Sequence, residues 1–270
     1  MVWTKLPQYL VILSTPLFLE LVIIPGFLTT AHAQSETLTQ TTANLSLQKV
    51  TFEPRPDQPR PTITVGGGRR NDGKCSEDRN TSQPPTSDRQ SLEQHLTPIL
   101  PSSVSDVHLT VLTHPTFLVY VPETSAKAVE FILEDPDGVE LYRIGMNLKN
   151  TPSIVSIGLP ATAPELEIGK DYKWIVAMVC QSPSPEDPFA EGLVRRIQPD
   201  SALNRLENAK HLEPLEQVAV YAKLGIWYEA SAKLAALRNT QPNNPSVVLA
   251  WEQLLQDVGL GAIADVPVKN

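Results

Sequence analysis

The chain has 270 residues, of which 41% are hydrophobic and 19% charged, with 25 prolines, two cysteines and a formal net charge of -8. This composition excludes a collagen, a coiled coil built from heptads and a strongly basic nucleic-acid-binding protein. The length is sufficient for the core of one or two small domains. None of these counts indicates a catalytic or binding site.

The N-terminal residues 1–33 have the pattern of a secretory signal peptide. Lys5 precedes an apolar stretch from Leu10 to Leu28, and Ala31-His32-Ala33 is a small-x-small site, so we predict cleavage after Ala33. The alternative is an uncleaved membrane anchor, because the stretch is about long enough to span a bilayer. Glu20 in its middle disfavours a spanning helix. Both interpretations predict a periplasmic or extracellular protein.

Export would place the two cysteines in an oxidising compartment, where they can form a disulfide. Cys75 and Cys180 are the only cysteines, so one pairing is available to them. We predict a disulfide, because disulfides persist in oxidising compartments. Two free, buried thiols are the alternative, but Cys75 lies in a polar, glycine-rich segment that offers little apolar burial.

Residues 34–104 are predicted to be a disordered, Pro/Ser/Thr-rich tail or linker. Pro54, Pro56, Pro59 and Pro61 follow one another at short spacing. Such a segment buries too little apolar surface to offset its chain entropy. Its basic and acidic residues cancel, so it is not a charged arm for nucleic acid or membrane.

Short runs of β-branched and aromatic residues, separated by turn residues, occupy residues 105–199. Several of them alternate apolar and polar residues, as half-buried strands do. Their number and spacing predict an immunoglobulin-like antiparallel β-sandwich. The runs are Val107–Thr113, Phe117–Val121, Val129–Glu134, Val139–Asn147, Ile154–Leu159, Tyr172–Gln181 and Gly192–Gln198.

Two local signals support the sandwich. The sequence Asp135-Pro136-Asp137-Gly138 predicts a hairpin turn between the third and fourth strands. Residues 166–172 have the spacing of a tyrosine corner, in which the Tyr172 hydroxyl hydrogen-bonds back to the preceding loop. Trp174 shares a strand face with Tyr172 and is predicted to fill the core.

Residues 200–270 change to a helical period, which makes the predicted fold class α+β. Gly225 and Gly259 fit helix ends and lie one tetratricopeptide period apart. The tetratricopeptide-like region covers about one and a half repeats, so it must dock on the sandwich or on a partner. The predicted helices are Ser201–Asn208, Pro214–Leu224, Tyr228–Asn239 and Pro245–Val258.

The sequence predicts no catalytic, cofactor-binding or metal-ligating residue, so we expect a protein that is not an enzyme. Gly68-x-x-x-x-Gly73-Lys74 imitates a phosphate-binding loop, but Cys75 stands where the magnesium-binding Ser or Thr belongs. The histidines outside the predicted signal peptide are scattered without metal-ligand spacing.

Two groups of residues are candidates for partner binding. Arg195 and Arg196 alternate on a predicted strand, so one of them should face outward and bind a carboxylate; a cross-strand pair with an acid of the sandwich is the alternative. Trp227, Tyr228 and Trp251 are candidate interface residues, or they form the core between sandwich and helices. The sequence contains no basic patch, so we expect no binding to nucleic acid or anionic lipid through charge.

The order of these parts resembles a family of exported cyanobacterial proteins known as the domain of unknown function DUF 928. The resemblance spans residues 66 to about 260 and implies a cyanobacterial, exported protein without implying an activity. Leu193 departs from it, since an aromatic residue is expected there. The residues that carry it are Gly68-Arg69-Arg70, Gly73-Lys74-Cys75, Pro115-Thr116-Phe117, Tyr120-Val121-Pro122-Glu123-Thr124-Ser125-Ala126, Ile154-Val155-Ser156-Ile157, Gly169-Lys170-Asp171-Tyr172-Lys173-Trp174, Glu191-Gly192, Val194-Arg195-Arg196 and Gly225-Ile226-Trp227-Tyr228.

Three functions remain open from the sequence. The first is a non-catalytic module of the cell envelope that binds another envelope protein or acts as a scaffold. The second is an exported hydrolase or glycan-active enzyme, which requires a concave pocket with several titratable groups. The third is a glycan-binding sandwich, which would carry a row of exposed aromatic residues on one sheet face.

Overall fold

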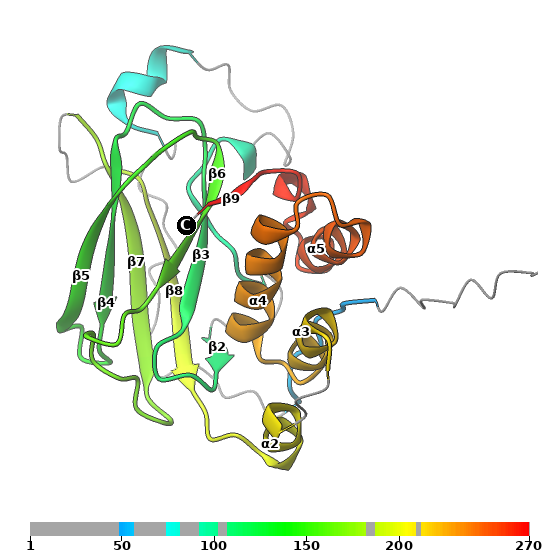
Figure 1. The fold of residues 1–270 in the computed structure, drawn as a ribbon. Coiled ribbons are helices and arrows are strands. Elements are labelled where there is room, and N and C mark those ends of the chain that lie inside the picture. Colours follow the sequence, from blue (N-terminus) through cyan, green and yellow to red (C-terminus); the bar gives the residue numbers. More distant parts are fainter. Residues whose placement is uncertain are drawn as a thin grey trace, which may run out of the picture. The chain divides into compact units, whose positions relative to one another are not determined.

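Seven strands form where the alternating runs predict them in a computed structural model of the chain (Figure 1). The structure describes residues 49–56, 74–81, 92–101, 107–181, 187–208 and 212–269; the predicted signal peptide, Gly68 and Gly73 lie outside them. Two-residue strands β1 and β9 are too short to show a period in the sequence. The strands are β1 (Thr97–Pro98), β2 (Val107–Thr110), β3 (Thr116–Val121), β4 (Ala128–Glu134), β5 (Glu140–Asn147), β6 (Ser153–Gly158), β7 (Asp171–Val179), β8 (Phe189–Arg196) and β9 (Val268–Lys269).

The strands form two sheets that pack face to face. One has the order β2-β8-β7-β4-β5, and the other has the order β1-β3-β6-β9. The antiparallel prediction is correct for β3–β6, β4–β5, β4–β7 and β7–β8 but wrong for β2–β8, which is parallel. Of the pairs that involve the short strands, β1–β3 is antiparallel and β6–β9 is parallel. The strands of each parallel pair are far apart in the sequence, so no hairpin turn sets their direction.

Both local turn predictions are confirmed. Gly138 has a φ of 79°, and the Asp135 carboxylate accepts hydrogen bonds from the backbone N–H groups of Asp137 (2.9 Å) and Val139 (2.8 Å). The Tyr172 hydroxyl accepts a hydrogen bond of 3.0 Å from the Glu167 N–H, which closes the loop before β7. These contacts set the entry of two strands into the larger sheet.

The four predicted helices form with ends within one residue of the prediction: α2 (Ser201–Asn208), α3 (Pro214–Lys223), α4 (Trp227–Thr240) and α5 (Pro245–Asp257). The described part of the chain also contains two short 3₁₀ helices, η1 (Ser76–Thr81) and η2 (Gly261–Ile263). Pro214 and Pro245 occupy first-turn positions, where their missing N–H groups cost no hydrogen bond. No helix among the described residues is long and apolar enough to cross a membrane.

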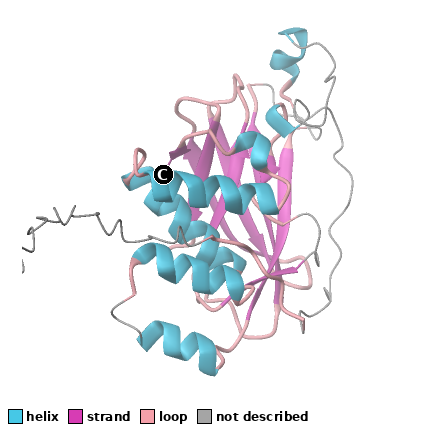
Figure 2. Ribbon diagram, turned by 90° about the vertical axis from the view of Figure 1, so that its right-hand side faces the viewer, coloured by secondary structure: helices cyan, strands magenta, loops and turns pink. Residues whose placement is uncertain are grey.

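The helices lie against the smaller sheet, so this sheet is the middle layer (Figure 1). Figure 2 shows the helices in front of the strands. Alternation in β3 shows the arrangement: Phe117 and Val119 face the larger sheet, whereas Leu118 and Tyr120 face the helices. Helix α4 contacts β2, β3 and β9 directly. Each face of the middle sheet therefore contributes to a separate hydrophobic cluster.

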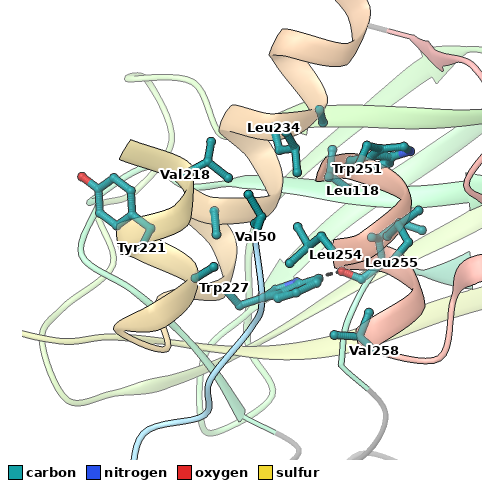
Figure 3. Close-up of a cluster of buried hydrophobic side chains, with 14 of the residues drawn as sticks. Val50, Leu118, Val218, Tyr221, Trp227, Leu234, Trp251, Leu254, Leu255 and Val258 are labelled. Carbon is teal, nitrogen blue, oxygen red and sulfur yellow. Dashed lines mark hydrogen bonds between the residues drawn. The ribbon is translucent and has the colours of Figure 1, made fainter. Parts of the chain in front are cut away.

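Pieces of residues 34–104 belong to the core, so the prediction of a tail is wrong for them. The side chains of Val50, Cys75 and Ile99 are at most 1% exposed. Val50 packs among the helices, and the indole N–H of Trp227 donates to the Ile99 carbonyl oxygen at 2.9 Å (Figure 3). Single apolar residues in a polar segment show no period, so the sequence could not reveal this packing.

Residues 45–270 form one compact unit. Residues of β2 and β8, such as Leu109 and Leu193, share a hydrophobic cluster with α3, α4 and α5. The predicted boundary between residues 199 and 200 thus marks a change of secondary structure within a shared core.

The predicted disulfide between Cys75 and Cys180 is present. Its Cα atoms are 5.6 Å apart and its residues are separated by 105 positions in the sequence. It joins Cys75, just before η1, to Cys180, just after β7, so it links one residue of the predicted tail covalently to the end of a strand of the larger sheet.

We expect the Cys75→Ser, Cys180→Ser double variant to lose about 2 to 5 kcal/mol of unfolding free energy, because its unfolded chain is no longer closed into a long loop. Urea titration without reductant measures the difference. Reductant should lower the stability of the wild type and leave the variant unchanged. Equal urea midpoints for the two oxidised proteins would contradict the prediction.

The Gly192→Ala variant should lose about 1 to 3 kcal/mol of stability through overpacking. A Cβ atom at Gly192 would lie 2.7 Å from the indole of Trp174, which is fully buried. Gly145→Ala is the matched control, since a Cβ there meets nothing within 4 Å. Thermal unfolding of both variants checks the prediction, which fails if their melting temperatures shift equally.

Candidate functional site

A groove between α3 and α4 is the candidate functional site. Its volume is about 200 Å³, and its lining residues are Pro214, Gln217, Lys233, Ala236, Leu237 and Thr240. Proline, alanine and leucine make much of this lining apolar, and Lys233 is its single ionisable residue. The groove therefore combines apolar walls with one positive charge.

The groove exists because α3 and α4 use their other faces for the core. Val218 and Ala222 of α3 and Leu234 of α4 are buried in the cluster below it (Figure 3). Ala236 lies two residues beyond Leu234, so its small side chain faces solvent. The Lys233 ammonium lies 3.4 Å from the Gln217 side-chain oxygen and 5.8 Å from the centre of the Tyr221 ring.

Glu229, one turn before Lys233 on α4, connects this helix to the end of β2. One carboxylate oxygen accepts hydrogen bonds from the Thr110 hydroxyl (2.7 Å) and from the N–H groups of Val111 (2.8 Å) and Leu112 (3.2 Å). Burial raises the pKa of this carboxyl, and these hydrogen bonds oppose the rise. The second oxygen is buried without a hydrogen-bond partner among the described residues.

His108 is a second buried titratable residue, on β2. Burial lowers the pKa of its imidazole to about 4, and its Nδ1 has no hydrogen-bond partner in the described part of the chain. His108 and Glu229 are both buried, at 3% and 2% exposure. They are therefore not positioned to meet a substrate from solvent.

The candidate arginines are both used within the fold. Arg195 stands opposite Asp171 in the β7–β8 register, and its guanidinium donates to that buried carboxylate at 2.8 Å. Arg196 donates to the carbonyl oxygens of Val111 (3.3 Å) and Leu166 (3.0 Å). Arg195 therefore forms a cross-strand pair with an acid of the sandwich, which is the alternative to partner binding. Arg196 instead contacts carbonyl groups of two loops.

The candidate aromatic residues lie in the interior, at 0% exposure for Trp227 and Trp251 and 2% for Tyr228. The Tyr228 hydroxyl accepts a hydrogen bond from the Trp174 indole N–H at 2.8 Å and donates to the Leu193 carbonyl oxygen at 3.1 Å. Burial raises the pKa of this hydroxyl. These positions match the alternative interpretation of the three rings as core.

Sequence reasoning missed the groove residues. Lys233, Leu237 and Thr240 recur at spacings of four and three, which places them on one helix face. Polar residues on that face resemble an ordinary solvated surface, and only the position of α3 beside it creates a groove.

One cluster among the described residues has the composition of a metal site. The ligand atoms of Cys75, Glu77 and Cys180 lie within 4.8 Å of one another. Both cysteines are joined in the disulfide, so they have no thiolate to donate to a metal ion.

The fold is a mixed α+β fold with two sheets, a helical layer and a groove without paired ionisable groups. The sequence matches the family described as Domain of Unknown Function (DUF928) over residues 65–268, so the chain belongs to this family, as its motifs predict. The search among curated proteins found no match.

A crystal structure of an FMN-binding beta-glucuronidase from Facaelibacterium prausnitzii L2-6 is a distant structural match. The sequence identity is 12% and the TM-score is 0.23, and the match covers 64% of this chain and 32% of the other. Similarity at this level indicates no shared activity.

We expect the buried His108 to destabilise the fold in acid. Its unfolded pKa is 6.5 and its folded pKa about 4, so the unfolded state binds the proton first and stability falls as pH decreases through this window. Between pH 6.5 and pH 4, the unfolding free energy should fall by about 3 kcal/mol through His108 alone. The raised pKa of Glu229 acts in the opposite sense, because the folded state then takes up its proton first.

The His108→Leu variant should lose less stability than the wild type between pH 6.5 and 4. Urea unfolding at several pH values measures the difference, which isolates His108 because Glu229 is present in both proteins. Val111→Ala, a core substitution without a titrating group, should keep the wild-type pH dependence. Parallel curves for His108→Leu and the wild type would refute the prediction.

Proposed function

We propose that the chain is an exported, non-catalytic module of the cell envelope that binds a segment of another protein in the α3–α4 groove. In this proposal the helices are a tetratricopeptide-like cap on an immunoglobulin-like sandwich. The protein is cyanobacterial and periplasmic or extracellular, and its signal peptide is cleaved after Ala33. The groove is the observation on which the binding function rests.

The occupant that fits the groove is an amphipathic segment with a bulky apolar side chain and a carboxylate. The apolar side chain would fill the space beside Ala236 and Leu237, and the carboxylate would meet the Lys233 ammonium. Helical grooves commonly bind partners through apolar residues at spacings of three and four. The buried face of α4 holds this surface in place, which reduces the entropy lost on binding.

The geometry of the α3–α4 groove gives less support to a catalytic function than to a binding function. A glycosidase needs two carboxyl groups across its substrate. Among the described residues, none that lines the groove carries a carboxyl group. His108 and Glu229 are buried away from solvent.

A glycan-binding surface also lacks support. Tyr142 and Phe189 are partly exposed aromatic residues of the larger sheet, but β4 and β7 separate their strands. Tyr142 stands opposite the buried Leu133, whereas Phe189 stands opposite Ala177 on the other face. The two rings therefore do not form a row.

The disulfide supports export. A bond between Cys75 and Cys180 is stable in an oxidising compartment and rare in the cytosol. An exported protein normally meets no nucleotide pool, which agrees with a binding role.

Selection of a random phage-displayed peptide library on the full chain tests the proposal. We expect enriched peptides to carry a large apolar residue three or four positions from a carboxylate. Fluorescence anisotropy of a selected peptide should show at least about tenfold weaker binding to Ala236→Arg, which fills the groove, and to Lys233→Glu, which repels the carboxylate.

Asn239→Arg is the matched control, because Asn239 is an exposed residue of α4 outside the groove lining and the substitution adds the same charge as Ala236→Arg. It should bind the peptide as the wild type does. Peptides whose binding is unaffected by both groove variants, or a selection that enriches none, would overturn the proposed function.

A further inference from the structure

Strand β5 ends the larger sheet with a free edge. It is eight residues long, and among the described residues it pairs with β4 only (Figure 1). On its outer side, alternate residues direct N–H and C=O groups away from β4. A row of this kind is a template for another strand unless the strand is short or blocked.

One face of β5 carries an apolar ridge, formed by Tyr142, Ile144 and Met146. In the β4 register these residues stand opposite the buried Leu133, Phe131 and Val129. Ile144 nevertheless remains 39% exposed, because β5 is the last strand of its sheet. A further strand beside β5 would cover the ridge.

The other face of β5 holds a charge cluster with an open space next to it. The Arg143 guanidinium binds the carboxylates of Glu140 and Glu130, which hold it on this face of the strand. Two residues on, a Cβ at Gly145 would have no atom of the described residues within 4 Å apart from Gly145 itself and its chain neighbours. Glycine inside a strand permits close approach of another chain.

We propose that β5 pairs antiparallel with β5 of a second copy of this chain, with Ile144 on the twofold axis. In this register Ile144 stands opposite its own equivalent and Tyr142 stands opposite Met146, so the two ridges form one apolar strip. Arg143 stands opposite Gly145, whose open space accommodates the second guanidinium. The two larger sheets become continuous across the dimer.

The neighbouring symmetric registers fit less well. Centring the pair on Arg143 places two guanidinium groups directly opposite each other, which is destabilising. Centring it on Tyr142 or on Gly145 leaves only five residues of each β5 facing one another, against seven when Ile144 is the centre. A shift by a single residue would place apolar side chains opposite the polar face, because side chains alternate along a strand. Ile144 is therefore the centre that the side chains favour.

Cross-linking tests the register directly. Opposed residues of antiparallel strands have Cβ atoms about 4.5 to 5.5 Å apart, close enough for a disulfide after a small adjustment. The native cysteines are already paired, so Ile144→Cys introduces the only free thiol. We expect the oxidised Ile144→Cys protein to run as a covalent dimer on non-reducing gels, and Ile168→Cys, at a 49% exposed position before β7, to remain a monomer.

Sedimentation equilibrium of the full chain tests the dimer without a cross-link. Ile144→Lys places two ammonium groups face to face, and we expect its dimer dissociation constant to rise at least about tenfold. Ile168→Lys should dimerise as the wild type does. Unchanged melting temperatures at low protein concentration would show that both variants fold.

Three results would overturn the proposal. They are a wild-type chain that is monomeric at its highest soluble concentration, equal cross-linking of the two cysteine variants, and a dimer insensitive to Ile144→Lys. A monomer whose Ile144→Cys thiol cross-links to a different protein in a cell extract would assign the edge to a heterologous strand and would also refute the homodimer.

Discussion

The first turn of α4 holds the helices and both sheets together through three consecutive buried residues. Trp227 donates to the carbonyl of Ile99 beside β1, Tyr228 bonds with Trp174 and with the Leu193 carbonyl of the larger sheet, and Glu229 accepts hydrogen bonds from the end of β2. Because these groups are shielded from water, loss of any one partner would leave a buried polar atom unpaired. The layered arrangement therefore depends on this turn, which fixes α4 in position and rotation.

A fixed rotation of α4 determines what the protein presents to solvent. With Trp227, Ala230 and Leu234 in the core, the exposed side of α4 carries Lys233 and Ala236, and α3 beside it completes the groove. The surface is thus built on regular helices supported by a packed layer, which favours preorganised binding. The same burial removes the three candidate aromatic residues from the surface and gives them a structural role.

The two proposals concern opposite parts of the fold. In Figure 1, β5 lies at the far margin of the larger sheet, and α3 lies in the helical layer. A dimer joined at β5 would leave both grooves accessible. Two grooves on one particle would increase the avidity for a partner with repeated segments if their spacing allows both to bind. This combination is consistent with a scaffold in the cell envelope, where neither nucleotide energy nor catalysis is required.

The sequence by itself determined the local structure: seven strands, four helices, the Asp135–Gly138 turn, the tyrosine corner and the only available disulfide. These follow from periods, turn residues and cysteine number, which act over a few residues or leave no alternative. The parallel edge pairs, the burial of Val50 and Ile99, the partners of Arg195 and Arg196, the interior position of Trp251 and the α3–α4 groove were decided by tertiary structure. A period shows which face of an element is apolar, but which distant element covers that face depends on packing of the whole chain.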